Sequence, residues 1–312
     1  MKKIRFGLIG TGIVGERVIN QILKNSEAEI TAVYDEDKNR LKEISAKYGL
    51  KMAGTVEELL DAKPDWVYIG TPPVSHAPLA EMIAERGIRI LSEKPLAHDY
   101  SSGEQMVRVS KEAGVQTAMH FPLMYSPVVH ELKRAVEQKE LGDIVRIELH
   151  THFPHWPRKW QQNPWIGSRE QGGFIREVFP HYLQLAYHLF GELDIASHST
   201  EYPMDESLCE TGVIAIGKTS GGIPLLLNGL SGIGQEERLE FRVHGTEKVM
   251  ILRNWSELWV SEKDMSEKKI EVNGEVVSLI QSCCDTVRGR KALTVGFEEG
   301  LLVQGLIDEL LK

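Results

Sequence analysis

The stretch that decides the fold lies at the start of the chain and reads Ile4-Arg5-Phe6-Gly7-Leu8-Ile9-Gly10-Thr11-Gly12-Ile13-Val14-Gly15. Its first six residues predict a buried β-strand, and residues 16–24 have the apolar spacing of a helix. The turn between them has the pattern G-x-G-x-x-G. In such a turn the first glycine permits the bend, the second lets a pyrophosphate approach the backbone, and the third lets the helix pack on the strand. The predicted dinucleotide-binding residues are therefore Gly10, Thr11, Gly12, Ile13, Val14 and Gly15.

An acidic residue follows at the spacing that this interpretation requires. Asp35 stands 20 residues after the third glycine, at the end of a second predicted strand, where a carboxylate meets the ribose hydroxyls. It would repel a 2′-phosphate, and Glu36 and Asp37 add to the negative field. Lys38 and Arg40 could offset that field, but we expect them on the exposed face of the next helix. NAD is therefore expected rather than NADP; the alternative is a structural turn beside a solvated Asp35.

The first 120 residues alternate short apolar runs with helical patterns. The runs predict strands, and the segments between them have the length and spacing of helices, which is typical of βαβ units in a parallel sheet. The expected strands span 4–9, 30–34, 66–69, 88–91 and 115–120, and the expected helices span 16–24, 38–48 and 77–86.

The pattern changes after about residue 121. Strands joined by glycine turns dominate from 195 to 271, which favours a mostly antiparallel sheet. Two helices, 128–140 and 174–190, and a strand, 143–153, precede them. We expect an α/β fold in which a dinucleotide-binding Rossmann domain with a doubly wound parallel sheet (1–120) is followed by an α+β domain with a large open sheet (121–312). The closing helix near 294–312 could pack back on the first domain.

Composition excludes several classes of protein. The 312 residues carry 36 Lys and Arg against 45 Asp and Glu, a net charge of -9, which argues against a general nucleic-acid binder. No stretch approaches the roughly 20 apolar residues that cross a bilayer. The three cysteines form no secreted disulfide framework, and the first residues show no cleaved leader. We expect a cytoplasmic protein with no membrane partner.

Two further segments follow predicted strands at the edge of the sheet where ligands bind in such folds. One is Gly70-Thr71-Pro72-Pro73-Val74-Ser75-His76, whose prolines would stiffen a loop under a nicotinamide ring. The other is Ser92-Glu93-Lys94-Pro95-Leu96.

With these motifs the sequence resembles the oxidoreductase family named for glucose-fructose oxidoreductase, inositol dehydrogenase and the rhizopine-catabolism protein MocA. The resemblance rests on the glycine turn, the 70–76 loop, Glu93-Lys94-Pro95 and Gly172-Gly173…His181, and it runs through nearly the whole chain. It implies further cofactor contacts from Thr71, Pro72, Pro73, His76, Glu93 and Lys94.

The resemblance also implies the catalytic groups. In the family the lysine of Glu-Lys-Pro lies beside the nicotinamide and bonds the reacting oxygen, and a downstream acid and histidine complete the site. Lys94 and His181 match, whereas Glu177 stands where the family usually has Asp. Glu177 and His181 are four residues apart, so we expect them on one helix face. A base with a pKa near 7 suits hydride transfer from a hydroxyl, and histidine supplies one; alone, His181 could equally be a packed core residue.

The substrate pocket is less defined. The family's usual Asn-Arg pair before Ser-Pro is replaced by Pro122 and Leu123, so a polar contact is missing. The segment 152–165 is dense in tryptophan and could either hold a sugar ring or pack an interface. The histidines show no zinc-ligand spacing, so no metal is expected. Candidate substrate residues are His120, His155, Trp156, Trp165 and Arg176.

These observations predict an NAD(P)-dependent oxidoreductase that moves hydride reversibly between nicotinamide and a secondary hydroxyl or carbonyl of a sugar, an inositol or a related polyol. Three alternatives remain: a reductase of C=N or of a less polar carbonyl, a redox-neutral glycoside-cleaving enzyme that retains NAD, and a non-catalytic dinucleotide-binding regulator. The resemblance also suggests a homodimer or homotetramer packed through the open face of the second sheet.

Overall fold

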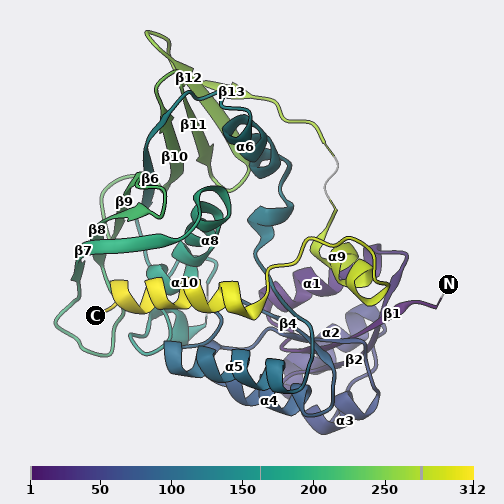
Figure 1. The fold of residues 1–312 in the computed structure, drawn as a ribbon. Helices are drawn as coiled ribbons and strands as arrows, with labels where there is room; N and C mark the ends of the chain where they lie inside the picture. The colour runs from purple at the N-terminus through teal and green to yellow at the C-terminus, as the bar shows by residue number, and fades with distance from the viewer. Residues whose placement is uncertain (1, 162, 275–276) are drawn as a thin grey trace. The chain divides into compact units, whose positions relative to one another are not determined.

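The computed structural model describes residues 2–161, 163–274 and 277–312, and the chain divides into two compact units (Figure 1). The first unit comprises residues 1–120 with 277–301, and the second comprises 121–276 with 302–312. Residues 277–301 belong to the first unit, whereas the sequence led us to expect a second domain of 121–312 whose closing helix near 294–312 could pack back on the first. Two bonds explain this placement: the Trp66 indole donates to the Cys283 carbonyl at 3.1 Å, and the Met119 amide donates to the Val295 carbonyl at 2.8 Å.

The first unit is built on a five-stranded parallel sheet in the order β2-β1-β3-β4-β5, which confirms the expected Rossmann architecture. Its strand order reverses between β1 and β3. The carboxyl ends of these two strands therefore form the switch point at which such sheets bind ligands. The strands are β1 (Ile4–Ile9), β2 (Ala28–Tyr34), β3 (Trp66–Ile69), β4 (Arg89–Ser92) and β5 (Thr117–Met119).

Among the residues that the structure describes, six α-helices lie wholly in this unit. The sequence predicted three of them, although α1 starts at Ile13 rather than at residue 16; it did not predict α3, which is only six residues long, nor α5 and α9. The six are α1 (Ile13–Lys24), α2 (Lys38–Tyr48), α3 (Val56–Asp61), α4 (His76–Ala84), α5 (Tyr100–Glu112) and α9 (Leu279–Val287). Helix α10 (Phe297–Leu310) begins in the first unit and continues in the second.

The second unit contains an eight-stranded sheet in the order β13-β12-β11-β10-β6-β9-β8-β7. Every neighbouring pair is antiparallel except β6 and β9, which run parallel, so the expected mostly antiparallel sheet is confirmed. Helices α6 (Pro127–Glu137), α7 (Phe174–Glu177) and α8 (Phe179–Phe190) also belong to this unit. The strands are β6 (Ile144–Phe153), β7 (Leu193–Glu201), β8 (Gly212–Thr219), β9 (Pro224–Ser231), β10 (Arg238–Gly245), β11 (Lys248–Arg253), β12 (Glu257–Glu262) and β13 (Lys268–Ile270).

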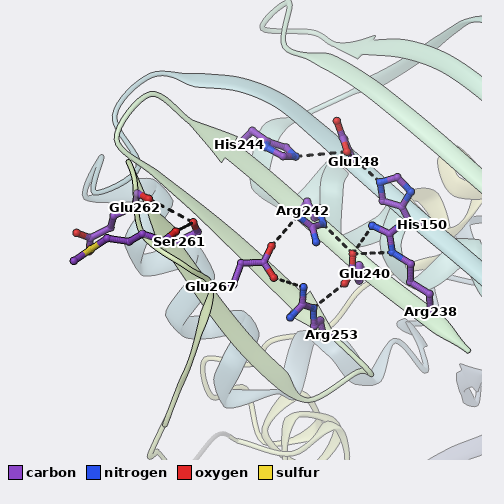
Figure 2. A network of polar contacts seen from close by, with 11 residues as sticks. Glu148, His150, Arg238, Glu240, Arg242, His244, Arg253, Ser261, Glu262 and Glu267 are labelled. Carbon is purple, nitrogen blue, oxygen red and sulfur yellow. Dashed lines mark hydrogen bonds and ion pairs between the residues drawn. The ribbon is translucent and has the colours of Figure 1, made fainter. Parts of the chain in front are cut away.

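The two faces of this sheet differ in character because alternate residues point to opposite sides. One face carries residues such as Leu149, Phe241 and Leu252, which share a core with helices α6 and α8. The other face carries a network of ion pairs along β6, β10 and β11, shown in Figure 2. Glu240 at its centre is bonded by Arg238, Arg242 and Arg253, Glu267 pairs with Arg242 and Arg253, and Glu148 contacts His150 and His244.

The character of that open face changes toward β8. Ile214 and Ile216 point outward there and are 56% and 53% exposed. The open face is therefore charged along β6, β10 and β11 and apolar at this point of β8. Among the described residues, none of the helices has the length and apolar character needed to cross a membrane.

Candidate active site

The glycine turn has the geometry that a dinucleotide requires. Gly10 has φ +94°, and a Cβ on it would lie 2.4 Å from the Gly70 carbonyl oxygen, so only glycine fits. A Cβ on Gly15 would lie 2.3 Å from the Gly10 oxygen, where the helix packs on the strand end. Gly12 faces open space, with nothing within 4 Å of an added Cβ. As the N-cap of α1 it has no side chain to cover the first amides of the helix, so the turn fits a pyrophosphate.

Asp35 is bonded to this turn. Its Oδ2 accepts from the Thr11 amide at 2.7 Å and from the Thr11 hydroxyl at 2.8 Å. The carboxylate therefore lies at the end of β2 beside the turn, where ribose hydroxyls would meet it. Arg40 was expected on the exposed face of α2 but is only 22% exposed, because its Nε donates to the Thr11 carbonyl at 2.8 Å.

The loop after β3 is stabilised from inside the unit. Thr71 and Pro72 are half-buried, and the Ser75 hydroxyl donates to the Thr71 hydroxyl at 2.6 Å. His76 was predicted to touch the cofactor, but it has no exposed surface. Its ring nitrogens lie 3.1 Å from the Leu96 carbonyl oxygen and 2.9 Å from that of Thr71. The ring thus links the loop after β3 to the segment after β4, and Pro73 in the same loop is also buried.

A buried polar cluster lies behind the Glu-Lys-Pro segment. The Glu93 Oε1 accepts from the Tyr68 hydroxyl at 2.8 Å and lies 2.5 Å from His120 Nδ1. Burial opposes ionisation of Glu93, but the His120 and Lys94 side chains outweigh it and hold the pKa of this carboxyl below its usual range. His120, predicted to bind substrate, is instead 7% exposed and bonded to Glu93.

Parallel register explains how this cluster forms. Ser92 pairs with Met119, so Glu93 and His120 each follow the end of a neighbouring strand, and the His120 amide donates to the Ser92 carbonyl at 2.8 Å. Lys94 comes next and is half-buried, close enough for its charge to stabilise the Glu93 carboxylate. The cluster therefore supports the backbone that carries Lys94.

In the second unit, the predicted helix 174–190 is broken. Helix α7 ends at Glu177 and α8 begins at Phe179, with Val178 between them at φ -117°. Pro180 provides the physical reason, because it has no amide to donate to the carbonyl four residues earlier and its ring disfavours continuous helix there. Glu177 and His181 therefore lie on two successive helices rather than on one regular helix, and their placement on a common face stays a prediction.

His181 is surrounded by aromatic rings. It is 7% exposed, and its ring meets those of Phe121 and Trp255 edge to face, with centroids 6.1 and 5.0 Å apart. Trp255 also packs on Tyr182, whose hydroxyl is buried, and burial raises the pKa of that phenol far above its usual range. No local pattern in the sequence indicates that Trp255, in the turn between β11 and β12, packs against α8.

The remaining substrate candidates lie elsewhere in the second unit. The Trp156 indole packs against Phe153 and Phe174 and donates to the Ile166 carbonyl at 3.3 Å, so it is part of the core. Arg176 Nη1 donates to the Arg169 and Gly172 carbonyls, which ties its guanidinium to the preceding loop. His155 is exposed and Trp165 is half-buried.

The Gly172-Gly173 pair has a structural reason that the sequence did not provide. Gly173 has φ +97°, and a Cβ on it would lie 2.2 Å from Oε2 of Glu210. Glu210 is 1% exposed and accepts from the Ile175 amide at 2.7 Å. Burial raises the pKa of this carboxyl to about 7. The glycine thus makes room for a buried acid that holds the start of α7.

No group of three or more His, Cys, Asp or Glu side chains with metal-binding geometry occurs within residues 2–161, 163–274 and 277–312.

Comparisons with known proteins cover most of the chain. Residues 4–121 match the model of the oxidoreductase family with an NAD-binding Rossmann fold, and residues 129–251 match that of the GFO/IDH/MocA C-terminal domain. Inositol 2-dehydrogenase of Rhizobium meliloti is 24% identical over 260 residues, which are 80% of this chain and 76% of that protein. An uncharacterized oxidoreductase of Streptococcus pneumoniae is 29% identical over 171 residues, 54% of this chain but only 46% of that relative's length.

Solved structures extend the likeness to the whole fold. The WlbA dehydrogenase of Bordetella pertussis, in complex with NADH and UDP-GlcNAcA, superposes with a TM-score of 0.82 at 20% identity. The superposition covers 99% of this chain and 94% of that one. At this identity the likeness is one of fold.

Proposed function

Because the chain belongs to the GFO/IDH/MocA oxidoreductase family, with its NAD-binding Rossmann fold, we propose that it is an NAD-dependent dehydrogenase acting on a secondary hydroxyl of a sugar, an inositol or a related polyol. The observation that carries the proposal is the edge of the parallel sheet. Three features follow the carboxyl ends of strands at this edge: the open turn at Gly12 after β1, the Asp35 carboxylate after β2, and the segment with Lys94 after β4.

The residues of the turn would bind the cofactor through its anionic and ribose parts. The amides at the start of α1 suit the pyrophosphate, and Asp35 suits the ribose hydroxyls and opposes a 2′-phosphate. NAD, when bound, supplies the acceptor for the hydride that leaves the substrate carbon.

Lys94 and His181 would handle the substrate oxygen. Oxidation of a hydroxyl to a carbonyl removes a hydride from carbon and a proton from oxygen, so the alkoxide that develops needs a cation and the proton needs an acceptor. We assign the first role to Lys94, whose ammonium follows the buried Glu93 carboxylate, and the second to His181. Glu177 remains a candidate for orienting one of these two side chains. Because the helix is broken at Val178, a shared helix face no longer supports this role.

The substrate class is supported by the names of the relatives. Inositol 2-dehydrogenase acts on a cyclic polyol, and the WlbA structure holds a sugar nucleotide. Both are rings that carry secondary hydroxyls. The side chains around His181 add apolar ring surface, chiefly Trp255, which would suit the apolar face of such a ring.

We propose further that the protein is a cytoplasmic homodimer or homotetramer. The exposed Ile214 and Ile216 on the open face of the second sheet support self-association, because burial of these two side chains would remove apolar surface from water. The three cysteines are free and buried, which suits a reducing compartment. Ile216→Asp is expected to yield a smaller species in light scattering while the circular dichroism spectrum stays that of a folded protein; an unchanged mass would contradict this interface.

An absorbance assay tests the activity. The protein is offered NAD with inositols, aldoses, sugar acids and sugar nucleotides, beside Lys94→Met and Gly12→Ala. We expect turnover with at least one ring polyol, a loss of about 10³-fold or more in Lys94→Met with NADH binding retained, and a loss of NADH binding in Gly12→Ala without unfolding. Turnover that persists in Lys94→Met, or release of a sugar with no net NADH, would overturn the proposal.

A further inference from the structure

A network of charged side chains joins the first turn of α1 to α2, directly beside the glycine turn. Glu16 accepts from Arg40 Nη2 at 2.5 Å, from Lys47 Nζ at 2.7 Å and from the Tyr48 hydroxyl at 2.8 Å. Lys47, Tyr48 and Arg40 together lower the pKa of Glu16 to about 2. Glu16 is therefore a permanent anion at physiological pH.

Arg40 is held on three sides by this arrangement. Besides the bond to Glu16, its Nη1 lies 3.0 Å from a Glu43 carboxylate oxygen and its Nε donates to the Thr11 carbonyl. Thr11 is also the residue whose amide and hydroxyl bind Asp35. The Arg40 guanidinium and the Asp35 carboxylate therefore both bond to Thr11 in the glycine turn.

This position matters because NAD and NADP differ only in the 2′-phosphate of the adenine ribose, the part of the cofactor that Asp35 is placed to meet. An arginine near this ribose is the usual means of accepting the phosphate, since its planar fork matches phosphate oxygens. Arg40 has the right chemistry and neighbourhood, but each of its three guanidinium nitrogens already contacts one of Thr11, Glu43 and Glu16. Lys38, the other cation after β2, lies 4.6 Å over the Tyr34 ring.

We propose that Glu16 is a specificity-determining positioning residue for the cofactor: by holding and neutralising Arg40, it denies the 2′-phosphate of NADP a cation, and so acts together with Asp35 to select NAD. The inference rests on the proposed dinucleotide binding. The choice of NAD over NADP then has two causes: Asp35 repels the 2′-phosphate directly, and Glu16 keeps Arg40 from binding it.

The experiment measures dissociation constants of NADH and NADPH by their fluorescence, which needs no substrate or turnover. We compare the intact protein with Glu16→Gln, Arg40→Gln, the double variant and the matched control Lys47→Gln, which removes another partner of Glu16 but leaves Arg40 held. In Glu16→Gln we expect NADPH to bind roughly tenfold more tightly, because a freed guanidinium gains a charge-assisted bond to phosphate. NADH affinity is expected to stay within about twofold in all variants, which also reports an intact turn.

The remaining variants separate this mechanism from a general loosening of the helices. The double variant should lose the gain in NADPH affinity, while Arg40→Gln alone and Lys47→Gln should leave the NADPH to NADH ratio unchanged. An unchanged ratio in Glu16→Gln, a gain that survives in the double variant, or a specific loss of NADPH binding in Arg40→Gln would each overturn the inference. Binding of neither nucleotide to the intact protein would overturn the proposed function with it, whereas NADH binding without turnover would count against the activity alone.

Discussion

Two buried glutamates, Glu93 in the first unit and Glu210 in the second, show how differently two sites in the molecule affect the same side chain. Glu93 is 8% exposed and Glu210 is 1% exposed. Burial raises the pKa of a carboxyl in both places. At Glu93 the His120 and Lys94 side chains outweigh this effect and the pKa falls, whereas at Glu210 burial dominates and the pKa rises to about 7.

The difference lies in the partners rather than in the depth. Glu93 has a phenol, an imidazole and an ammonium close by, all contributed by the carboxyl ends of parallel strands. Glu210 accepts one backbone amide through Oε1, and no described residue donates a hydrogen bond to its buried Oε2. Parallel strand ends therefore surround the Glu93 carboxylate with stabilising partners, while the loop between β7 and β8 holds Glu210, an acid that exchanges its proton near neutrality.

The largest expected effect comes from removing the charge of Glu93. Glu93→Gln should destabilise the protein by about 3–5 kcal/mol, because it leaves charged partners without their buried counter-ion. Urea unfolding at pH 7 measures this. Since the folded-state pKa is depressed, the stabilisation is present above pH 4.5 and is lost as the pH falls through the folded-state pKa. A variant as stable as the intact protein at pH 7 would show that the cluster contributes no net stability.

Glu210→Gln should act in the opposite direction. A carboxyl whose pKa rises from 4.5 to about 7 on folding costs nothing at low pH, and its cost grows as the pH rises through that window to about 3 kcal/mol above pH 7. The variant should therefore be more stable than the intact protein at pH 8 by up to this amount and nearly equal to it at pH 4. Unfolding curves at both pH values measure the difference; a variant that is less stable at pH 8 would mean that Glu210 is stabilised as the anion.

The sequence predicted the glycine turn because backbone geometry restricts those positions to glycine at a fixed spacing. A Cβ added to Gly10 or to Gly15 would lie within 2.4 Å of a carbonyl oxygen, so the backbone of this turn accepts only glycine at both positions. The parallel order of the first sheet and the mostly antiparallel second sheet followed in the same way from strand spacing.

What the sequence could not provide depends on contacts between distant residues. Tyr68, Glu93 and His120 come together through the register of three strands, so His120 looked like a pocket residue until its neighbour was known. Helix periodicity over 174–190 hid the break at Val178, although Pro180 was visible as a local signal. Glu210 carried no signal at all, because its burial arises from the loop that packs over it.

Tyr68→Phe tests the neutral part of the Glu93 cluster. The Tyr68 hydroxyl donates to the carboxylate, and desolvation together with the nearby Glu93 raises the pKa of this phenol well above its usual range, so it remains a donor at every accessible pH. Losing one bond to a charged acceptor should cost about 1.5–3 kcal/mol, less than losing the charge itself. Urea unfolding at pH 7 compares the stability of Tyr68→Phe with that of Glu93→Gln. If Tyr68→Phe lost as much stability or more, the phenol rather than the ion pair would contribute most of the stability of the cluster.

The smallest effect is expected at a glutamate that has a charged partner but no burial. Glu112 is 65% exposed and pairs with Arg108 one turn away on α5, with the charged atoms 3.3 Å apart. Water and salt screen such a pair, so Glu112→Gln should change the unfolding free energy by less than about 0.5 kcal/mol. Unfolding at low and high salt measures it beside Glu93→Gln, whose deficit should persist in salt because the buried charges are shielded from ions. If the two variants lost the same stability and responded alike to salt, burial would not explain the stability of the Glu93 cluster. The contrast between Glu93 and Glu210 would then not depend on burial either.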